Sequence, residues 1–381
     1  MEIRGRFGSI GNLIDAVANK PVSDAAETTV YAGSVKPLPT EDLEHILRHT
    51  GTLWEAARGK RLFISGGTGF FGAWLLESLA FCNHRLRLDL SATVLSRNPE
   101  AFLRRMPHLA GDSAVRLLKG DVRDFTSPDE RFDYLIHAAT PSSGEEASHP
   151  DLPATMIAGM ERMLGLAKAA RPQRFLFTSS GAVCGQQPED MSHIPESYTG
   201  IAERLSAYGE AKRRCEEMCA LCARESKTEF AIARCFAFVG PHLPLDQHFA
   251  IGNFIADALA GRPIQIAGDG TPTRSYLYAA DLAIWLWTLL LQPCGTGPEP
   301  LVYNVGSGEA LSIRELAHAV VEVLNPSLPI EIAQNAHAGA PRNQYVPDVT
   351  KAERELGLRA RIELREAIRR TADWYRSSGL T

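Results

Sequence analysis

A short glycine-rich stretch constrains this chain more than any other feature. The run 62–65 is mostly apolar, glycines follow at Gly66, Gly69 and Gly72, and a helical pattern resumes at Ala73. This order predicts a strand, a tight turn and the N-terminus of a helix. Glycines allow the close backbone approaches of such a turn, and the free N–H groups of the first helical turn favour an anion. The stretch therefore predicts a cradle for a dinucleotide diphosphate, against the alternative of a glycine-rich turn that binds nothing.

Composition excludes several classes of protein. The 381 residues are 45% apolar and can bury a sizeable core. There are 40 basic and 45 acidic residues, whereas a binder of nucleic acid or of a membrane surface needs a basic excess. The sequence shows neither a secretory signal nor an uninterrupted apolar run of ~18 residues. Seven scattered cysteines fit free thiols in a reducing compartment. We therefore expect a cytoplasmic protein with no nucleic-acid and no membrane partner.

Five further apolar runs predict a parallel sheet. They lie at 91–97, 115–118, 134–139, 174–180 and 230–234, and helical stretches such as 155–170 and 202–225 separate them. Alternating strands and helices are typical of an α/β fold with a doubly wound parallel sheet. Ligands of such sheets bind at the carboxyl ends of the strands, where Ser179 and Ser180 fall. Before this region, residues 1–58 form an extension with one helix, which runs from Thr40 to near Gly59 and packs on the domain that follows.

The end of the second predicted strand, Ser96-Arg97, bears on the cofactor. In a dinucleotide-binding fold this position meets the adenosine ribose, and an Asp or Glu there would bind the 2′-hydroxyl of NAD. A guanidinium suits a 2′-phosphate instead. We expect NADP or NAD, and Arg97 favours NADP; a solvated loop arginine is the alternative.

Tyr208 and Lys212 form a candidate base and its partner. They are four residues apart on a predicted helix, so the ammonium can lie near the phenol oxygen. A base that works near neutrality needs the pKa of the phenol lowered by roughly 3 units from ~10. Lys212 and a positively charged nicotinamide can supply that shift. Such pairs are common on exposed helices, but this one follows Ser180 at the end of a predicted strand.

At this point the chain resembles the extended short-chain dehydrogenase/reductase family, which includes nucleotide-sugar epimerases and dehydratases. The resemblance runs from about residue 60 to the C-terminus. The matching segments are 66–72, 120–122, 137–139, 178–185, 208–212, 239–241, 268–276, Asp281 and 303–308.

The resemblance implies the roles of individual residues. Ser180 would hydrogen-bond a sugar hydroxyl, Tyr208 would take its proton, and Lys212 would hold the nicotinamide ribose. The implied cofactor site consists of Gly66, Thr68, Gly69, Phe70, Phe71, Gly72, Ser96, Arg97, Asp121, Val122, His137, Ala138, Ala139, Tyr208 and Lys212. The implied contacts with a nucleotide-diphosphate sugar are Ser179, Ser180, Asn253, Arg274 and Arg342, with the two arginines on the diphosphate. A surface loop charge is the alternative for Arg342.

Gly181 and Ala182 decide among the reactions of the family. They stand where the dehydratases and decarboxylases of the family carry acidic residues, and they cannot transfer protons. Unless Glu196 or Glu210 reaches the site, we expect epimerisation through transient oxidation, at C4 of the sugar. An NADPH-dependent 4-keto-sugar reductase is the first alternative, a 4,6-dehydratase or decarboxylase the next, and a cofactor sensor without turnover the least favoured.

The resemblance also implies the division of the chain and its assembly. The expected Rossmann domain spans 60–240 and 277–306, and a smaller α/β lobe that binds the nucleotide sugar spans 241–276 and 307–381. The helix that begins near Tyr208 is expected to form a homodimer. On it, Cys215, Cys219 and Cys222 could suggest a metal, but without a histidine on that face a buried stripe of small residues is favoured. We expect no metal site, and His242 and His248 as pocket or loop residues.

Overall fold

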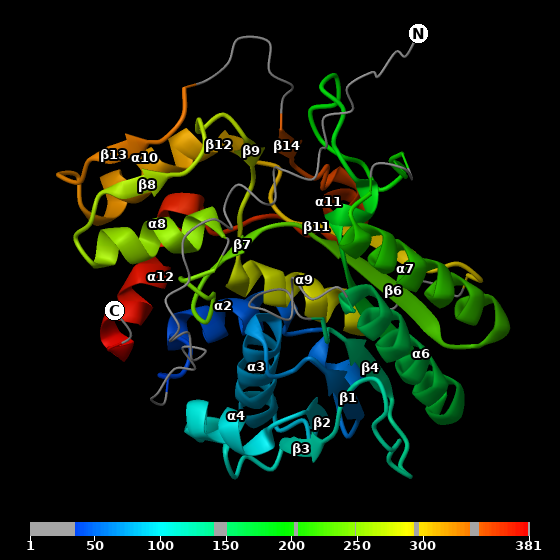
Figure 1. Cartoon of the computed structure of the whole chain (residues 1–381). Coiled ribbons are helices and arrows are strands. Elements are labelled where there is room, and N and C mark those ends of the chain that lie inside the picture. Colours follow the sequence, from blue (N-terminus) through cyan, green and yellow to red (C-terminus); the bar gives the residue numbers. More distant parts are fainter. Residues whose placement is uncertain are drawn as a thin grey trace, which may run out of the picture.

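The fold is a seven-stranded parallel sheet between two layers of helices (Figure 1). A computed structural model describes residues 35–140, 151–201, 205–247, 249–292, 297–335 and 343–379 of the chain. The strands of this sheet are β1 (Arg61–Ser65), β2 (Ser91–Ser96), β3 (Val115–Lys119), β4 (Tyr134–His137), β5 (Arg174–Ser180), β6 (Glu229–Cys235) and β11 (Leu301–Val305). They stand in the order β11-β6-β5-β4-β1-β2-β3, and every neighbouring pair is parallel. The expected doubly wound Rossmann sheet is confirmed.

The chain changes its direction of travel across the sheet at β1. It first adds β2 and β3 on one side, and then crosses to β4 on the other side of β1. Open α/β sheets bind their ligands in the crevice beyond the carboxyl ends of the strands at such a switch point. The glycine turn follows β1 and Ala138 follows β4, so the two line this crevice together.

Helices cover both faces of the sheet (Figure 1). Helices α3 (Phe70–Leu86) and α9 (Ala279–Leu291) pack together on one face, and α6 (Leu152–Ala170) and α7 (Ala207–Glu225) on the other. Successive side chains of β1 point to opposite faces of the sheet, and both faces are covered by helices. Leu62 and Ile64 join the core on the α3 side, whereas Phe63 joins the core on the α6 side.

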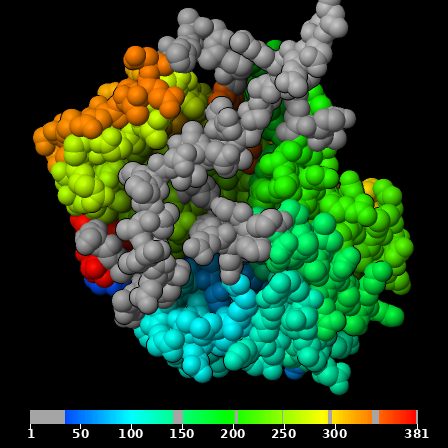
Figure 2. All heavy atoms as spheres, in the orientation of Figure 1, coloured from blue at the N-terminus to red at the C-terminus, as the bar shows by residue number. Residues whose placement is uncertain are grey.

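The later part of the chain builds a smaller lobe at the carboxyl edge of the sheet. Its helices are α8 (Ala250–Leu259), α10 (Ile313–Leu324) and α12 (Leu364–Ser378), and its short strands are β8 (Ile264–Ile266), β9 (Thr273–Arg274), β12 (Leu311–Ser312), β13 (Ile330–Ile332) and β14 (Gln344–Tyr345). Strands β7 (Phe238–Val239) and β10 (Leu277–Tyr278) join it to the sheet, and α4 (Pro99–Arg105) and η2 (Pro107–Leu109) lie between β2 and β3. Figure 2 shows the yellow-green and orange surface of the lobe at the opposite end from the cyan surface that follows β2. Helix α11 (Thr350–Leu356) packs instead beside β11, where Lys351 Nζ donates to the carbonyl oxygen of Val302 at 2.9 Å.

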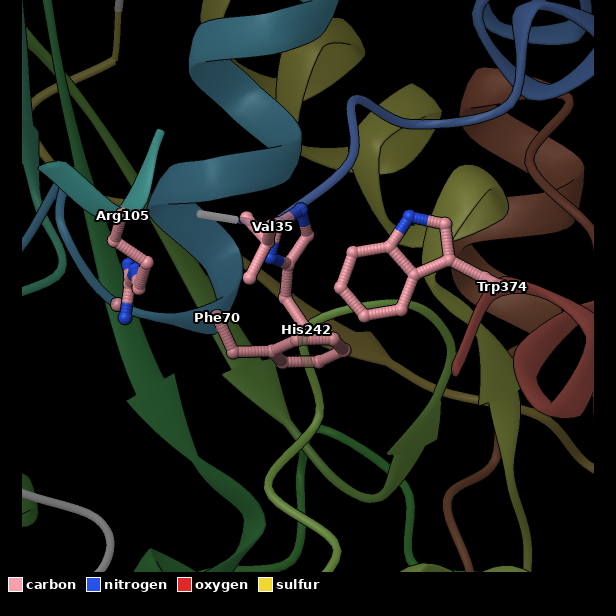
Figure 3. Close-up of a pocket in the computed structure, with 6 residues that line it drawn as sticks. Val35, Phe70, Arg105, His242 and Trp374 are labelled. Atoms are coloured by element: carbon pink, nitrogen blue, oxygen red, sulfur yellow. The ribbon is translucent and has the colours of Figure 1, made fainter. Parts of the chain in front are cut away.

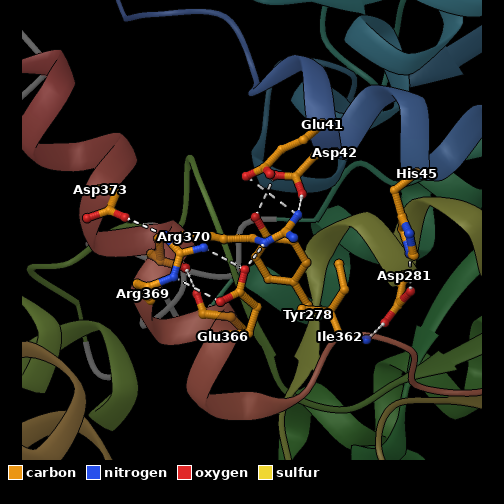
Figure 4. A network of polar contacts seen from close by, with 12 residues as sticks. Glu41, Asp42, His45, Tyr278, Asp281, Ile362, Glu366, Arg369, Arg370 and Asp373 are labelled. Carbon is orange, nitrogen blue, oxygen red and sulfur yellow. Dashed lines mark hydrogen bonds and ion pairs between the residues drawn. The ribbon is translucent and has the colours of Figure 1, made fainter.

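The first helix that the structure describes contacts both parts of the molecule (Figure 4). Helix α2 (Thr40–Thr50) follows Pro39 and ends earlier than expected, before the short η1 (Trp54–Ala57). The fully buried carboxylate of Asp42 accepts hydrogen bonds from Tyr278 Oη and from Arg370 Nη1, both at 2.6 Å. His45 pairs with Asp281 of α9 at 3.0 Å. The helix therefore packs on the following domain as predicted, and also reaches α12 of the lobe.

The cysteine stripe and the indoles belong to the core. Cys215, Cys219 and Cys222 are buried on α7, and the first two face α6, so the expected stripe is confirmed. Trp285 and Trp287 lie fully buried in α9. The part of the chain that the structure describes contains no group of three or more His, Cys, Asp and Glu that could hold a metal ion. Within the same residues, no helix has both the length and the apolar run that crossing a membrane requires.

Candidate active site

The glycine turn has the shape of a diphosphate cradle. Gly66 has φ +78°, and a Cβ there would lie 2.3 Å from the backbone carbon of Ala138. A Cβ on Gly72 would lie 2.2 Å from the backbone of Gly67, whereas one on Gly69 would have room. The backbone is thus packed as tightly as only glycine allows, and α3 begins immediately after Gly69. These residues fit a dinucleotide, because the free N–H groups of the helix N-terminus open onto the crevice.

A small pocket beside this turn is too small for a substrate (Figure 3). Its volume is about 20 Å³, and Phe70, Arg105, His242 and Trp374 are among its lining residues. That is room for about one water molecule. Arg105 Nη2 donates to the carbonyl oxygen of Thr68 at 2.5 Å, which braces the turn from below. His242 is a half-buried residue that lines this pocket, as expected, and His248 lies outside the described residues.

Helix α3 begins with two phenylalanines that belong to packing as much as to the turn. The rings of Phe71 and Phe238 meet edge to face at 5.2 Å, and Phe70 lies 5.7 Å from Phe71. Both residues are half-buried. They hold the first helical turn against β7.

The adenosine end of the crevice carries a charged pair. Ser96 ends β2 and is buried, whereas Arg97 is exposed. Asp121 accepts hydrogen bonds from Arg123 at 2.8 and 3.0 Å, and these bonds, with a smaller contribution from the charge of Arg97, hold the pKa of that carboxyl below its usual value. Val122 next to it packs beside α6. Asp121 therefore stays ionised and presents an acceptor at this edge.

His137 needs a correction as a cofactor contact. Its ring is 2% exposed. It shares a 2.7 Å hydrogen bond with Ser65 and stacks on Phe177 at 5.6 Å. Burial and the nearby Lys212 charge lower the pKa of His137 to about 3. The imidazole is a neutral core group, and only the backbone of Ala138 and Ala139 reaches the glycine turn.

Ser180, Tyr208 and Lys212 come together at the carboxyl end of β5, and we call them the catalytic cluster. Helix α7 is capped by Ser206, whose side chain accepts from the Gly209 N–H at 3.1 Å, and this cap places Tyr208 in the first helical turn. The Tyr208 and Ser180 side chains lie within hydrogen-bonding reach of each other. Lys212 lies one turn further along, with Nζ 5.9 Å from the centre of the Tyr208 ring. The residues that the sequence singled out for proton transfer thus meet in space.

The electrostatics of the catalytic cluster differ from the expectation. Burial raises the pKa of Tyr208 to about 12, although the hydrogen bond with Ser180 acts in the opposite direction. Burial also lowers the pKa of Lys212 to about 8. Lys212 Nζ donates to Thr140 Oγ1 at 2.9 Å and to the Thr178 carbonyl oxygen at 2.8 Å, so its charge is directed at these two oxygens. In the protein alone, Lys212 therefore does not lower the pKa of Tyr208 as predicted.

Ser179 also needs a correction as a substrate contact. Because successive side chains of a strand point to opposite faces, Ser179 and Ser180 diverge. Ser179 is 3% exposed and donates to Glu216 Oε1 at 2.6 Å. Arg234 also binds Glu216, at 2.8 Å. Ser179 thus supports α7 from inside the protein.

Neither of the two acids considered for proton transfer is placed to act. Glu196 Oε1 accepts the backbone N–H of Asn304 at 2.9 Å. Glu210 is exposed on α7. The groups shown next to Ser180 and Tyr208 are hydroxyls and the Lys212 ammonium.

The predicted diphosphate contacts lie in the smaller lobe. Arg274 is half-buried on β9, and its Nη1 donates to the carbonyl oxygens of Thr273 at 2.8 Å and Asn343 at 3.1 Å. Burial lowers the pKa of Arg274. Asn253 is half-buried on α8. Arg342 lies outside the described residues.

Two neighbours of the catalytic cluster escaped the sequence analysis. Thr140 Oγ1 accepts a hydrogen bond from the Lys212 ammonium, and Tyr345 of β14 lies within hydrogen-bonding reach of Ser180. Nothing in the local pattern around Tyr345 points to this contact. Gly181 was the available signal, because a glycine directly after a strand often marks the close approach of another group.

Comparison with known proteins identifies the family and supports the fold. The model of the "NAD dependent epimerase/dehydratase family" matches residues 62–306. UDP-glucuronic acid decarboxylase 5 of Arabidopsis thaliana is 32% identical over 314 residues, which are 81% of this chain and 87% of that protein. UDP-N-acetylglucosamine 4-epimerase from Methanobrevibacter ruminantium M1 superposes with a TM-score of 0.72 at 20% identity, over 84% of this chain and 99% of that one. MoeE5 in complex with UDP-glucuronic acid and NAD gives a TM-score of 0.68 at 23% identity, over 84% and 99%.

These structural likenesses show the fold, and the family match covers the glycine turn, β5 and the start of α7 together. The chain is therefore an enzyme of the NAD dependent epimerase/dehydratase family, within the extended short-chain dehydrogenase/reductases.

Proposed function

We propose that this enzyme epimerises a nucleotide-diphosphate sugar by transient oxidation of one sugar hydroxyl, at C4. The observation that carries the proposal is the proximity of the Tyr208 and Ser180 hydroxyls at the carboxyl edge of the sheet, with Lys212 one helical turn away. A general base must lie within hydrogen-bond reach of the proton that it takes. A sugar bound in the crevice between this cluster and the glycine turn would present a hydroxyl to Tyr208.

The residues of the chain divide the work of proton transfer. Tyr208 takes the proton of the sugar hydroxyl and later returns it, and Ser180 orients the phenol that receives it. Lys212 keeps a positive charge beside the site, because burial lowers its pKa only to about 8. A dinucleotide held by the glycine turn would supply the acceptor and donor of the hydride that leaves and returns to the sugar carbon. Inversion requires only that the keto-sugar turns over between the two transfers, so no further acid is needed.

Decarboxylation is the second candidate, and the curated relatives favour it. The Arabidopsis thaliana proteins at 32% identity are UDP-glucuronic acid decarboxylases. Oxidation at C4 of a uronic acid gives a β-keto acid, in which loss of carbon dioxide leaves an electron pair on C5 that must take up a proton. Gly181 and Ala182 offer no acid for that step, and Glu196 is held by Asn304. We therefore place decarboxylation after epimerisation.

The choice between NAD and NADP as the cofactor is also a proposal. The family is NAD-dependent by description, and MoeE5 binds NAD. The exposed Arg97 after β2, with no carboxylate at position 96, supports NADP. We propose that the enzyme accepts NADP as well as NAD. Consumption of NADPH in each turnover is the mark of the reductase alternative.

The test is incubation of the full chain with UDP-, GDP-, CDP- and dTDP-sugars, including UDP-glucose and UDP-glucuronic acid, and with NAD or NADP. Products are separated by chromatography and weighed by mass spectrometry, with Tyr208→Phe as the control. A new isomer of unchanged mass supports the proposal. Loss of carbon dioxide or of water, or gain of two hydrogens, replaces it with the decarboxylase, dehydratase or reductase. An unchanged panel with every sugar refutes it.

The assembly and the compartment stay predictions. Leu221 on α7 is 56% exposed, which fits a homodimer through this helix. Analytical ultracentrifugation of the parent and of Leu221→Glu tests it, since a charge at the interface should yield monomers.

A further inference from the structure

Tyr345 is carried from the smaller lobe into the catalytic cluster. Its strand, β14, pairs in parallel with β9, where Tyr345 lies opposite Arg274. On the other side, the Val346 N–H donates to Gln187 at 3.0 Å, and the Ile194 N–H donates to the Val346 carbonyl oxygen at 2.8 Å. The segment is thus held from both parts of the molecule.

The phenol of Tyr345 contacts Ser180. The two side chains lie within hydrogen-bonding reach of each other. The Tyr345 ring packs on Phe236, with the ring centres 4.6 Å apart. A Cβ on Gly181 would lie 2.6 Å from Tyr345 Oη and 2.6 Å from Phe236 Cζ, so the missing side chain at 181 is what admits the phenol. Ser180 is thereby bounded by two phenols, Tyr208 and Tyr345.

Counting donors and acceptors fixes the direction of these bonds. A serine hydroxyl has one proton to donate and two lone pairs to accept with. One lone pair of Ser180 Oγ already accepts the Ala182 N–H at 3.1 Å. When Tyr208 has lost its proton it can only accept, so Ser180 must donate to it. The Tyr345 O–H is placed to fill the remaining lone pair of Ser180.

Tyr345 is suited to stay a donor. Burial raises its pKa well above the ordinary value for a phenol, so it keeps its proton at every pH at which the enzyme works. Chains of hydrogen bonds polarise one another, and a hydroxyl that accepts two bonds donates the third more strongly. A donor at Tyr345 therefore strengthens the bond from Ser180 to the Tyr208 oxygen.

We propose that Tyr345 is a positioning residue of the active site, which donates to Ser180 so that Ser180 donates to Tyr208 when Tyr208 has given up its proton. The proposal rests on the proposed role of Tyr208 as the base. No proton leaves Tyr345 in this scheme, because the proton of the sugar hydroxyl goes to Tyr208. The smaller lobe thus sets the strength of the base in the sheet domain.

The test is Tyr345→Phe, which removes one oxygen and keeps the ring on Phe236. We expect the acid limb of the pH profile of kcat to move up by about one pH unit, the size of one lost hydrogen bond. Below this limb kcat should fall about tenfold, and above it return to the parent value, with KM changed less than about twofold. The matched control is Tyr134→Phe, a buried tyrosine at the opposite end of the sheet that bonds the Ala56 carbonyl oxygen, and its profile should stay in place.

A second measurement separates this inference from the proposed function. The absorbance of ionised tyrosine is titrated in the full chain, and the titration of Tyr208 is isolated by subtracting that of Tyr208→Phe. In Tyr345→Phe this titration should shift to higher pH by about one unit, whether or not any sugar is turned over. A Tyr208 titration and a pH profile that both stay in place refute the role of Tyr345. A shifted titration in a protein that converts no sugar refutes the proposed function and leaves the positioning role standing.

Discussion

Replacing Lys212 with methionine should make the protein more stable at neutral pH while it abolishes turnover. Lys212 is 2% exposed. Burial lowers its pKa from 10.5 to about 8, so the folded protein holds a charge in a place that disfavours it. Methionine fills most of the same volume without that charge. Lys212, which we propose acts in the reaction, therefore destabilises the folded protein at neutral pH.

The magnitude follows from the pKa and the two hydrogen bonds. The fall from 10.5 to about 8 corresponds to ~3 kcal/mol of destabilisation by the charged amine. Methionine leaves Thr140 Oγ1 and the Thr178 carbonyl oxygen without this donor, at about 1 kcal/mol each. We expect the free energy of unfolding of Lys212→Met to exceed that of the parent by about 1 kcal/mol at pH 7.

The sign of the difference should reverse with pH. A lowered pKa means that folding favours the neutral amine, and this contribution is complete above pH 10.5 and lost as the pH falls through about 8. Above pH 10.5 the parent has no charge penalty left and keeps both hydrogen bonds. There it should be the more stable protein, by about 2 kcal/mol.

The assay is urea unfolding of both proteins at pH 7 and above pH 10, followed by tryptophan fluorescence. Lys351→Met is the matched control, because Lys351 also donates to a strand carbonyl, at 2.9 Å, and lies over an aromatic ring, that of Tyr303, at 4.6 Å. Lys351 is half-exposed, so its variant should lose a little stability equally at both pH values. A Lys212→Met protein that is less stable than the parent at pH 7, or a gap that does not change with pH, refutes the reasoning.

Three further changes test other parts of the molecule. Tyr208→Phe should keep dinucleotide binding, measured by calorimetry, and lower kcat by roughly 10²- to 10⁴-fold, because the base is gone; parent-like turnover would exclude Tyr208 as the base. Asp42→Ala leaves the Tyr278 hydroxyl buried without its acceptor and should lower the free energy of unfolding by about 2–3 kcal/mol. Its control, Glu44→Ala, breaks an exposed ion pair on the same helix and should lower it by under about 0.5 kcal/mol. Equal losses would contradict the role of α2 in joining the two parts of the molecule. Arg97→Ala should weaken NADP binding roughly tenfold and leave NAD binding unchanged, and a parallel loss for both would contradict the 2′-phosphate assignment.

Local sequence patterns were enough to predict the fold and to single out Ser180, Tyr208 and Lys212. The glycine turn, the strands and the helix that carries Tyr208 and Lys212 each follow from residues that are neighbours in the sequence. Their order along the chain then leaves few arrangements other than a doubly wound sheet, since crossovers between parallel strands are right-handed. The meeting of Ser180 with Tyr208 follows in turn, because the carboxyl ends of parallel strands share one edge.

What each side chain faces was decided only by tertiary structure. Ser179 and His137 stand beside residues of the crevice, but both side chains turn into the core, where Glu216 and Ser65 meet them. Tyr345 reaches Ser180 because β14, which lies near the C-terminal end of the chain, pairs with β9 in the smaller lobe. The sequence by itself determined the architecture and the candidate base, since these depend on local periodicity and spacing. Burial and long-range packing determined the ionisation of the base and its second hydroxyl partner, because desolvation depends on every element that covers a group.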